Sequence, residues 1–174
     1  MNALVIVDVK AKQVNKPYTY IVPKEFEGII ERGSRVIVPF GPRTVLGFVV
    51  DLIDEVNSNL KEIIEVLDIV PVLSMEMLSL SKVVAKETSS FLITVLKTMI
   101  PNALSVSYNK TLKKINDITT KEISDYFNDN EEIDFKVVDK KYYSSLKYEI
   151  KLKNIEVVYN YERKDKVKEN SFVK

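Results

Sequence analysis

The four glycines of this 174-residue chain all lie in its first 47 residues, and prolines are interleaved with them. The densest stretch is residues 33–43, with the sequence GSRVIVPFGPR. Glycine permits positive φ and close backbone approach, and proline fixes the direction of the chain. The front of the chain is therefore expected to fold as short β-strands turned back on one another.

The composition excludes several kinds of chemistry. The chain has no cysteine and no histidine, so disulfides, ordinary zinc sites and Ser-His-Asp catalysis are all ruled out. No phosphate-binding glycine loop or nucleophile elbow occurs, and carboxylate pairs such as Glu131-Glu132 lie in polar stretches without a burial signal. We expect no catalytic residue and no metal site. No apolar run approaches the ~20 residues that cross a bilayer, which predicts a cytoplasmic protein without a membrane contact.

The charge is balanced, with 26 Lys and Arg against 25 Asp and Glu and a formal net charge of +1. Residues 1–106 contain 11 basic and 12 acidic side chains, and the remainder contains 15 and 13. A broad basic groove that neutralises many phosphates is therefore not expected. Any contact with nucleic acid is expected to be small and local.

The pattern of the front half predicts a sheet followed by two helices. Strands are expected at residues 3–9, 18–22, 35–40 and 45–53, with a hairpin tip at 41–44. Residues 60–67 fit a strand or a helix by pattern alone, and we favour a strand. A helix capped by Ser74 is expected to extend to about Lys86 with Met77, Leu80 and Val84 on one face, and a second helix to extend from Leu92 to Pro101. Both helices are expected to pack against the sheet.

The back half has its own pattern. Residues 102–109 are interpreted as a linker, and a start resembling a capping box at 119–122 predicts a helix that ends near Phe127. A second helix is expected at 139–151, a strand at 155–161 and a frayed tail at 164–174. Helix, helix and strand in this order are typical of a winged helix. We therefore predict an α+β protein with two domains. Residues 1–105 form a small antiparallel β-barrel-like sheet module with two packed helices, which folds on its own, and residues 110–174 form a winged helix.

Tyr18, Gly41 and Lys61 are the candidate binding residues of the front half. An aromatic face, a glycine that lets a ligand reach the backbone and a lysine are the parts of a nucleotide pocket. Each also has an ordinary explanation, as a core aromatic residue, a turn residue and a surface charge. Arg32, Arg35 and Arg43 flank the same glycines, where they could direct a phosphate to the loop, and strand alternation is expected to place Arg35 on the solvent face.

In the back half, lysines alternate with tyrosines over residues 140–148. This interleaving fits a DNA-contacting helix, and it also fits a half-buried helix with tyrosines inside and lysines outside.

Several short motifs occur in a characteristic order over the first 101 residues. They are Tyr18-Thr19-Tyr20, Val22-Pro23, the core at 33–41, Gly47 to Val50, Leu60-Lys61 and Ile100-Pro101. In this order they resemble the N-terminal DNA-binding domain of the PriA family of bacterial replication-restart helicases, also called primosomal protein N′. The sequence departs from the family pattern at Thr19, where relatives have an acidic residue, and at Glu87-Thr88, where an aromatic pair is common.

The resemblance implies recognition of the terminal nucleotide at the 3′ end of a nascent strand at a stalled fork. The matching positions are Tyr18, Thr19, Gly41 and Lys61, and in relatives a winged helix follows. Arg43, Lys140, Lys141 and Lys147 are the candidate phosphate contacts. The helicase motor of relatives is absent from these residues, so we expect that this fragment has no enzymatic activity. ATP and zinc are expected to bind only to a helicase part outside this sequence.

The expected partners are branched or forked DNA with a 3′ end, and the candidate protein partners are primosome proteins and single-strand-binding protein. A different class of function also fits, a protein-interaction module that docks one of these proteins on its sheet edge and the Phe40-Gly41 loop. A small enzyme is the third class, but the sequence supplies no nucleophile with a base beside it.

Overall fold

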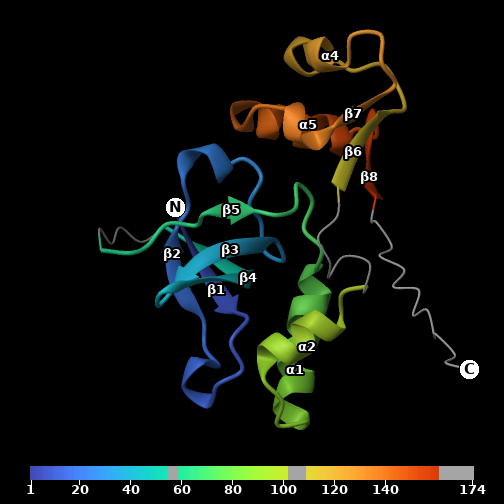
Figure 1. Ribbon diagram of the computed structural model, residues 1–174. Coiled ribbons are helices and arrows are strands. Elements are labelled where there is room, and N and C mark those ends of the chain that lie inside the picture. The colour runs from blue at the N-terminus through green and yellow to red at the C-terminus, as the bar shows by residue number, and fades with distance from the viewer. Residues whose placement is uncertain (55–58, 102–108, 161–174) are drawn as a thin grey trace, which may run out of the picture.

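The computed structural model describes residues 1–54, 59–101 and 109–160, and it confirms the α+β class. Residues 1–101, the N-terminal part, contain a five-stranded antiparallel sheet, and residues 109–160, the C-terminal part, contain a three-stranded one (Figure 1). The elements of the N-terminal part are β1 (Asn2–Val7), η1 (Lys12–Val14), β2 (Tyr18–Ile21), η2 (Lys24–Phe26), β3 (Arg35–Phe40), β4 (Arg43–Ile53), β5 (Glu65–Val66), α1 (Met75–Glu87) and α2 (Leu92–Thr98). Those of the C-terminal part are β6 (Asn109–Lys114), α4 (Lys121–Phe127), β7 (Glu132–Asp134), η3 (Phe135–Val137), η4 (Lys140–Tyr142), α5 (Tyr143–Lys151) and β8 (Ile155–Asn160).

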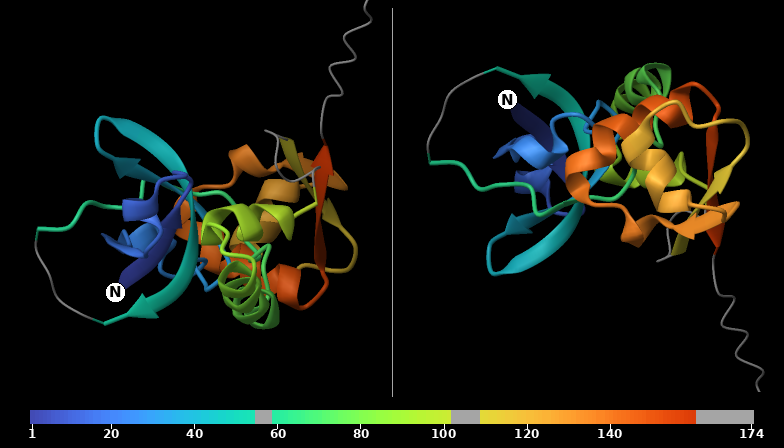
Figure 2. Two further views of the ribbon diagram at one scale, coloured as in Figure 1. Left: turned by 90° about the horizontal axis from the view of Figure 1, so that it is seen from below. Right: turned by 90° about the horizontal axis from the view of Figure 1, so that it is seen from above.

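The five-stranded sheet has the order β2-β1-β4-β3-β5, with all neighbours antiparallel. The register between β1 and β4 shifts between Leu4 and Val5, and such bulges increase twist and bend the strands. Figure 2 shows β3 and β4 as a long, curved hairpin. The sheet bends far enough for the Tyr20 hydroxyl of β2 to donate to the Pro39 carbonyl of β3 at 3.2 Å. The described residues nevertheless form no closed barrel, because β2 and β5 are the two ends of the strand order and only an isolated bridge between Ile21 and Glu62 connects β2 with the segment before β5.

Apolar residues on the two faces of the sheet form two cores. Along β1, Val5 and Val7 belong to the core inside the bend, whereas Ile6 belongs to the core beneath α1 and α2. In β4, Val49 and Phe48 divide in the same way, as the period of two along a strand requires. The prediction that two helices pack against the sheet is confirmed.

The first helix begins where the sequence predicts. The Ser74 side chain accepts from the Met77 backbone N–H at 3.3 Å and caps α1. Leu78 and Ser81 are the buried residues of this helix, and Leu80, predicted on the inner face, is 54% exposed. The predicted inner face was therefore wrong by part of a turn. Apolar residues occur on two adjacent faces of this helix, so their spacing alone does not decide which face is buried.

Two local predictions for the sheet need correction. Within residues 60–67 only Glu65–Val66 is a strand, because β5 pairs with β3 at two positions only. Before it, Glu62 forms an isolated parallel bridge with Ile21 of β2. The hairpin tip is also shorter than expected, since Arg43 already pairs with Phe40 and only residues 41 and 42 form the turn.

In the C-terminal part the strands take the order β7-β6-β8, and the predicted helices are found as α4 and α5. The strands β6 and β7 were not predicted, because Lys and Glu dominate their short sequences. The linker and tail predictions lie largely outside the described residues. Among the residues that the structure describes, no helix is long and apolar enough to cross a membrane.

The start of α4 is held by a carboxylate from α5. Thr120 occupies the N-cap, but its side chain caps no backbone N–H of the helix and its hydroxyl donates to Glu149 at 2.5 Å, so the predicted capping box is wrong. Instead, the buried Glu149 accepts from the Thr119 hydroxyl at 2.6 Å and from the Thr120 N–H at 2.8 Å. Burial alone would raise the pKa of Glu149, but the hydrogen bonds from Thr119, Thr120 and Asn154 lower this pKa to about 2.

The two parts contact one another through polar and apolar groups. The buried Lys147 ammonium of α5 donates to the Ile29 carbonyl at 2.7 Å and pairs with Glu31 at the same distance. A Cβ added at Gly28 would lie 1.7 Å from the Ser144 Oγ, so only glycine permits this approach. One continuous apolar core joins residues of both parts, including Phe26 and Leu146.

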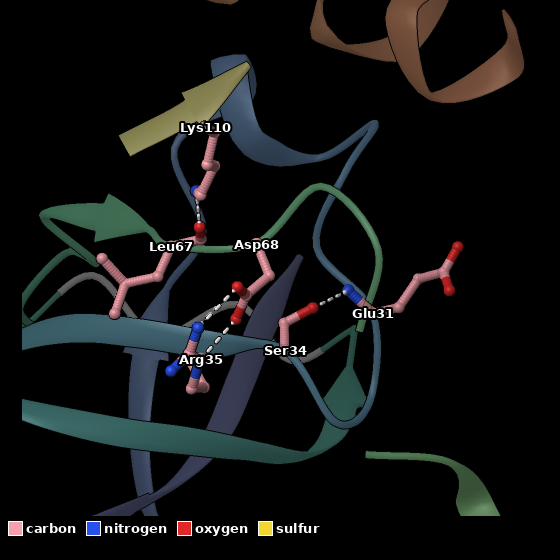
Figure 3. A network of polar contacts seen from close by, with 6 residues as sticks. All are labelled: Glu31, Ser34, Arg35, Leu67, Asp68 and Lys110. Atoms are coloured by element: carbon pink, nitrogen blue, oxygen red, sulfur yellow. Dashed lines mark hydrogen bonds and ion pairs between the residues drawn. The ribbon is translucent and has the colours of Figure 1, made fainter. Parts of the chain in front are cut away.

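A buried ion pair lies at the junction of the two parts (Figure 3). Arg35 of β3 donates to both carboxylate oxygens of Asp68, from Nε at 2.7 Å and from Nη2 at 2.8 Å. Both side chains are at most 5% exposed. The expectation that Arg35 faces solvent is therefore wrong, because the chain after β5 covers that face of β3 and Leu67 N–H donates to the Arg35 carbonyl. The adjoining Leu67 carbonyl accepts from the Lys110 ammonium of β6.

Arg35→Ala is expected to lower the free energy of unfolding by about 3–5 kcal/mol, because it leaves the Asp68 carboxylate buried without its main partner. Urea denaturation measures the effect. Arg32→Ala is the matched control, since its pair with Asp51 is more than 40% exposed on both sides and is expected to contribute about 1 kcal/mol or less. Equal losses in the two variants would contradict a structural role for the buried pair.

Glu149→Gln is expected to lower the free energy of unfolding at pH 7 by about 1–3 kcal/mol, because a neutral amide accepts these hydrogen bonds less strongly. The folded-state pKa of Glu149 is lowered from 4.5 to about 2, so its stabilisation is complete above pH 4.5 and is lost as the pH falls toward 2. Urea titrations over this range should show the stabilities of the wild-type and variant proteins converging. A constant difference down to pH 2 would mean that the Glu149 charge is not the cause.

Candidate functional site

Tyr18 is the first residue of β2, and its side chain is held by a contact with Phe40 of β3. Its ring is half-buried and meets the edge of the Phe40 ring at 5.1 Å between centroids and 80° between planes. Edge-to-face contact is a favoured aromatic geometry, so Phe40 fixes the Tyr18 ring in place. The Lys16 ammonium lies 5.8 Å from the same ring. The accessible remainder of Tyr18 therefore forms a fixed aromatic surface with a cation beside it.

Gly41 directly follows Phe40, the residue whose ring contacts Tyr18. Its φ is +59°, which suits the first central position of a type II′ hairpin turn, where glycine is preferred. No heavy atom lies within 4 Å of the position that a Cβ would occupy, so the space over the turn is open. Tyr18 is therefore linked to the glycine turn through its contact with Phe40, the residue before Gly41. A ligand at the ring could reach the backbone of the turn.

Thr19 belongs to β2, and Lys61 lies in the segment before β5, beside the end of β2. The Lys61 carbonyl accepts from the Ile21 N–H at 3.0 Å, which places the exposed lysine beside the end of β2. Three residues of strand separate Ile21 from Tyr18, or roughly 10 Å at 3.3 Å per residue. Thr19 pairs with Leu4 and, by strand alternation, directs its side chain to the face opposite Tyr18. These two residues border the site and do not contact the Tyr18 ring.

The candidate phosphate contacts are divided between the two parts. Arg43 follows the glycine turn, is exposed, and forms no ion pair with the residues of 1–54, 59–101 and 109–160. Lys140 pairs with Glu25 at 2.8 Å and lies over the Phe26 ring. Lys147 is buried against Ile29 and Glu31, and its pKa is lowered by burial, although Glu31 opposes this. Lys141 is exposed.

Two residues of the site are missing from the set predicted from sequence. Phe40 positions Tyr18, and its place directly before the turn glycine is the signal that would have identified it. Lys16 is the second. It lies in a polar loop whose position next to the Tyr18 ring depends on how the strands pair, and the sequence gives no signal of this.

Comparison with known proteins assigns the chain to a class of DNA-binding domains. Residues 4–101 match the model of the 3′ DNA-binding domain (3′BD) of PriA, and the chain belongs to this family. The chain is also 44% identical over 114 residues to the replication restart protein PriA of Bacillus subtilis (strain 168). That match covers 64% of this chain and 14% of the relative. The resemblance inferred from the sequence motifs is thus confirmed, and the family match includes Tyr18, Thr19, Gly41, Arg43 and Lys61.

Proposed function

We propose that this chain is the DNA-binding N-terminal portion of a replication-restart helicase and that it recognises the 3′ end of the nascent strand at a stalled fork. The observation that supports this most directly is the arrangement of Tyr18, Phe40 and Gly41 within the region that matches the 3′ DNA-binding family. Aromatic side chains hold nucleotides by stacking on bases, which is tolerant of base identity. An open glycine turn beside the ring leaves room for the terminal sugar.

In this proposal each residue has one role. Tyr18 contacts the terminal base, the Gly41 backbone approaches the sugar, and Lys61 neutralises a phosphate. Thr19, whose side chain is on the opposite face of β2 from Tyr18, supplies a neutral hydroxyl where relatives have an acidic residue. ATP-driven unwinding belongs to a helicase part outside this sequence. The C-terminal part is proposed to be a winged helix, supported by its two helices followed by the strand β8 of an antiparallel sheet.

The proposal is tested with matched forked DNAs that differ only at the 3′ terminus, one with a free hydroxyl and one with a phosphate. A site that recognises the terminal 3′ hydroxyl should lose that contact when a phosphate is attached to it. Binding to the free 3′ end should therefore be clearly tighter than binding to the blocked end. Equal affinity for the two forks would overturn recognition of the end.

Tyr18→Ala is expected to weaken binding to the fork with a free 3′ end by roughly ten- to hundredfold, because base stacking contributes ~1–3 kcal/mol. Binding to blunt duplex should stay nearly unchanged. Tyr18→Phe, which keeps the ring, should bind almost as the wild type. Tyr148→Ala is the control, since Tyr148 is an exposed tyrosine of the C-terminal part. Equal loss of affinity for the fork and the duplex would show that Tyr18 does not act at the end.

Lys61→Ala is expected to lower the magnitude of the slope of log K against log salt by about 0.7–0.9, the contribution of one neutralised phosphate. The loss should be the same for forks of different sequence, because a phosphate contact positions the strand without reading bases. Lys141→Ala, the exposed candidate of the C-terminal part, provides the comparison. If Lys141→Ala lowered the slope and Lys61→Ala did not, the phosphate contact would belong to the C-terminal part.

A further inference from the structure

The loop between β1 and β2, residues 8–17, is a concentrated basic surface in a chain of nearly balanced charge. It contains Lys10, Lys12 and Lys16, all exposed, and Asp8 as its only acidic residue. Asp8 pairs with Lys97 of α2 at 2.6 Å. None of the three lysines pairs with a carboxylate in the part of the chain that the structure describes. The loop therefore presents three positive charges to solvent.

This basic loop is held in a fixed shape. Its centre forms the short 3-10 helix η1, in which the Val14 N–H donates to the Ala11 carbonyl at 3.0 Å. The Asn15 side-chain oxygen accepts from the Leu92 N–H at 3.0 Å and so fastens the loop to the start of α2. A fixed loop loses little conformational entropy when a ligand binds to its side chains. The lysine side chains thus extend from a backbone that is already ordered before a ligand binds.

The basic loop adjoins the candidate site. The Asp8 N–H donates to the Leu46 carbonyl at 2.7 Å, so the loop begins beside the hairpin that carries Gly41. At its other end it leads directly into Tyr18, and the Lys16 ammonium lies beside that ring. In Figure 1 the loop forms the lower end of the blue strands, on the far side of the five-stranded sheet from α4 and α5. Its charge is therefore separate from that of the C-terminal part.

We propose that the basic loop binds the sugar-phosphate backbone of the strand whose 3′-terminal nucleotide lies at Tyr18. Lys12 and Lys16 each contact one phosphate, and Lys10 adds to the local positive field. The inference rests on the proposed function, because it takes the site at Tyr18 as the end of the strand. It identifies a second group of contacts, which fixes the direction in which the DNA leaves the site.

The test measures salt-dependent binding of the full chain to the fork with a free 3′ end. Lys12→Ala/Lys16→Ala should lower the magnitude of the slope of log K against log salt by about 1.4–1.8, and Lys12→Ala alone by about 0.7–0.9. Lys12→Arg/Lys16→Arg, which keeps both charges, should keep the wild-type slope. The ratio of affinities for free and phosphate-blocked ends should be unchanged in Lys12→Ala, because phosphate contacts do not read the end.

Lys121→Ala/Lys153→Ala is the matched control, since both lysines are exposed, lie in the C-terminal part and are not among the candidate phosphate contacts. This variant should keep the wild-type slope. The inference is overturned if Lys12→Ala/Lys16→Ala keeps that slope, or if the control variant loses it instead. Failure of the proposed function has a different signature, in which the wild-type chain binds free and blocked ends equally well.

Discussion

The buried pair of Arg35 and Asp68 is the interaction on which the arrangement of both parts depends. Arg35 belongs to β3, the strand that ends in the glycine turn, and Asp68 belongs to the segment between β5 and α1. Burying two charges is costly, and the two parallel hydrogen bonds of a guanidinium on a carboxylate are the geometry that best offsets this cost. The adjoining Leu67 carbonyl receives the Lys110 ammonium, so the same few residues orient the hairpin, the helices and the second sheet.

The bend of the five-stranded sheet creates the candidate site. In the order of the sheet, β1 and β4 separate β2 from β3, yet Tyr18 and Tyr20 of β2 contact Phe40 and Pro39 of β3. A flat sheet would hold these strands about 14 Å apart, at ~4.8 Å per neighbouring strand. The shift of register between β1 and β4 supports the bend. The aromatic surface at Tyr18 is therefore a tertiary feature, because the bend brings together residues of two strands that are not neighbours in the sheet.

Local signals predicted the parts of this fold that local physics controls. Runs of β-branched residues predicted the strands β1 to β4. The Ser74 hydroxyl before regularly spaced apolar residues predicted the start of α1, and a proline predicted the end of α2. The buried state of Arg35 could not be predicted, because its partner is 33 residues away and strand alternation says nothing of what covers the second face. The Glu149 cap of α4 is similar, since the carboxylate comes from the next α-helix. At the site, Tyr18 and Gly41 were identified by their residue types, whereas Phe40 and Lys16 depend on the bend of the sheet.

The counts of charged residues gave the net balance but not the location of available charge. Lysines of the C-terminal part that looked suited to DNA, Lys140 and Lys147, are paired with Glu25 and Glu31 and join the two parts. Their charges are largely satisfied within the protein, so moving them to a phosphate would leave a carboxylate without its partner. In the described part of the chain, a phosphate could bind the lysines of the basic loop without separating them from a carboxylate, because the only acidic residue of the loop is already paired with Lys97. An electrostatic surface for DNA is therefore defined by which cations remain unpaired after folding, and in the described part of this chain that criterion favours the end of the sheet that holds Tyr18.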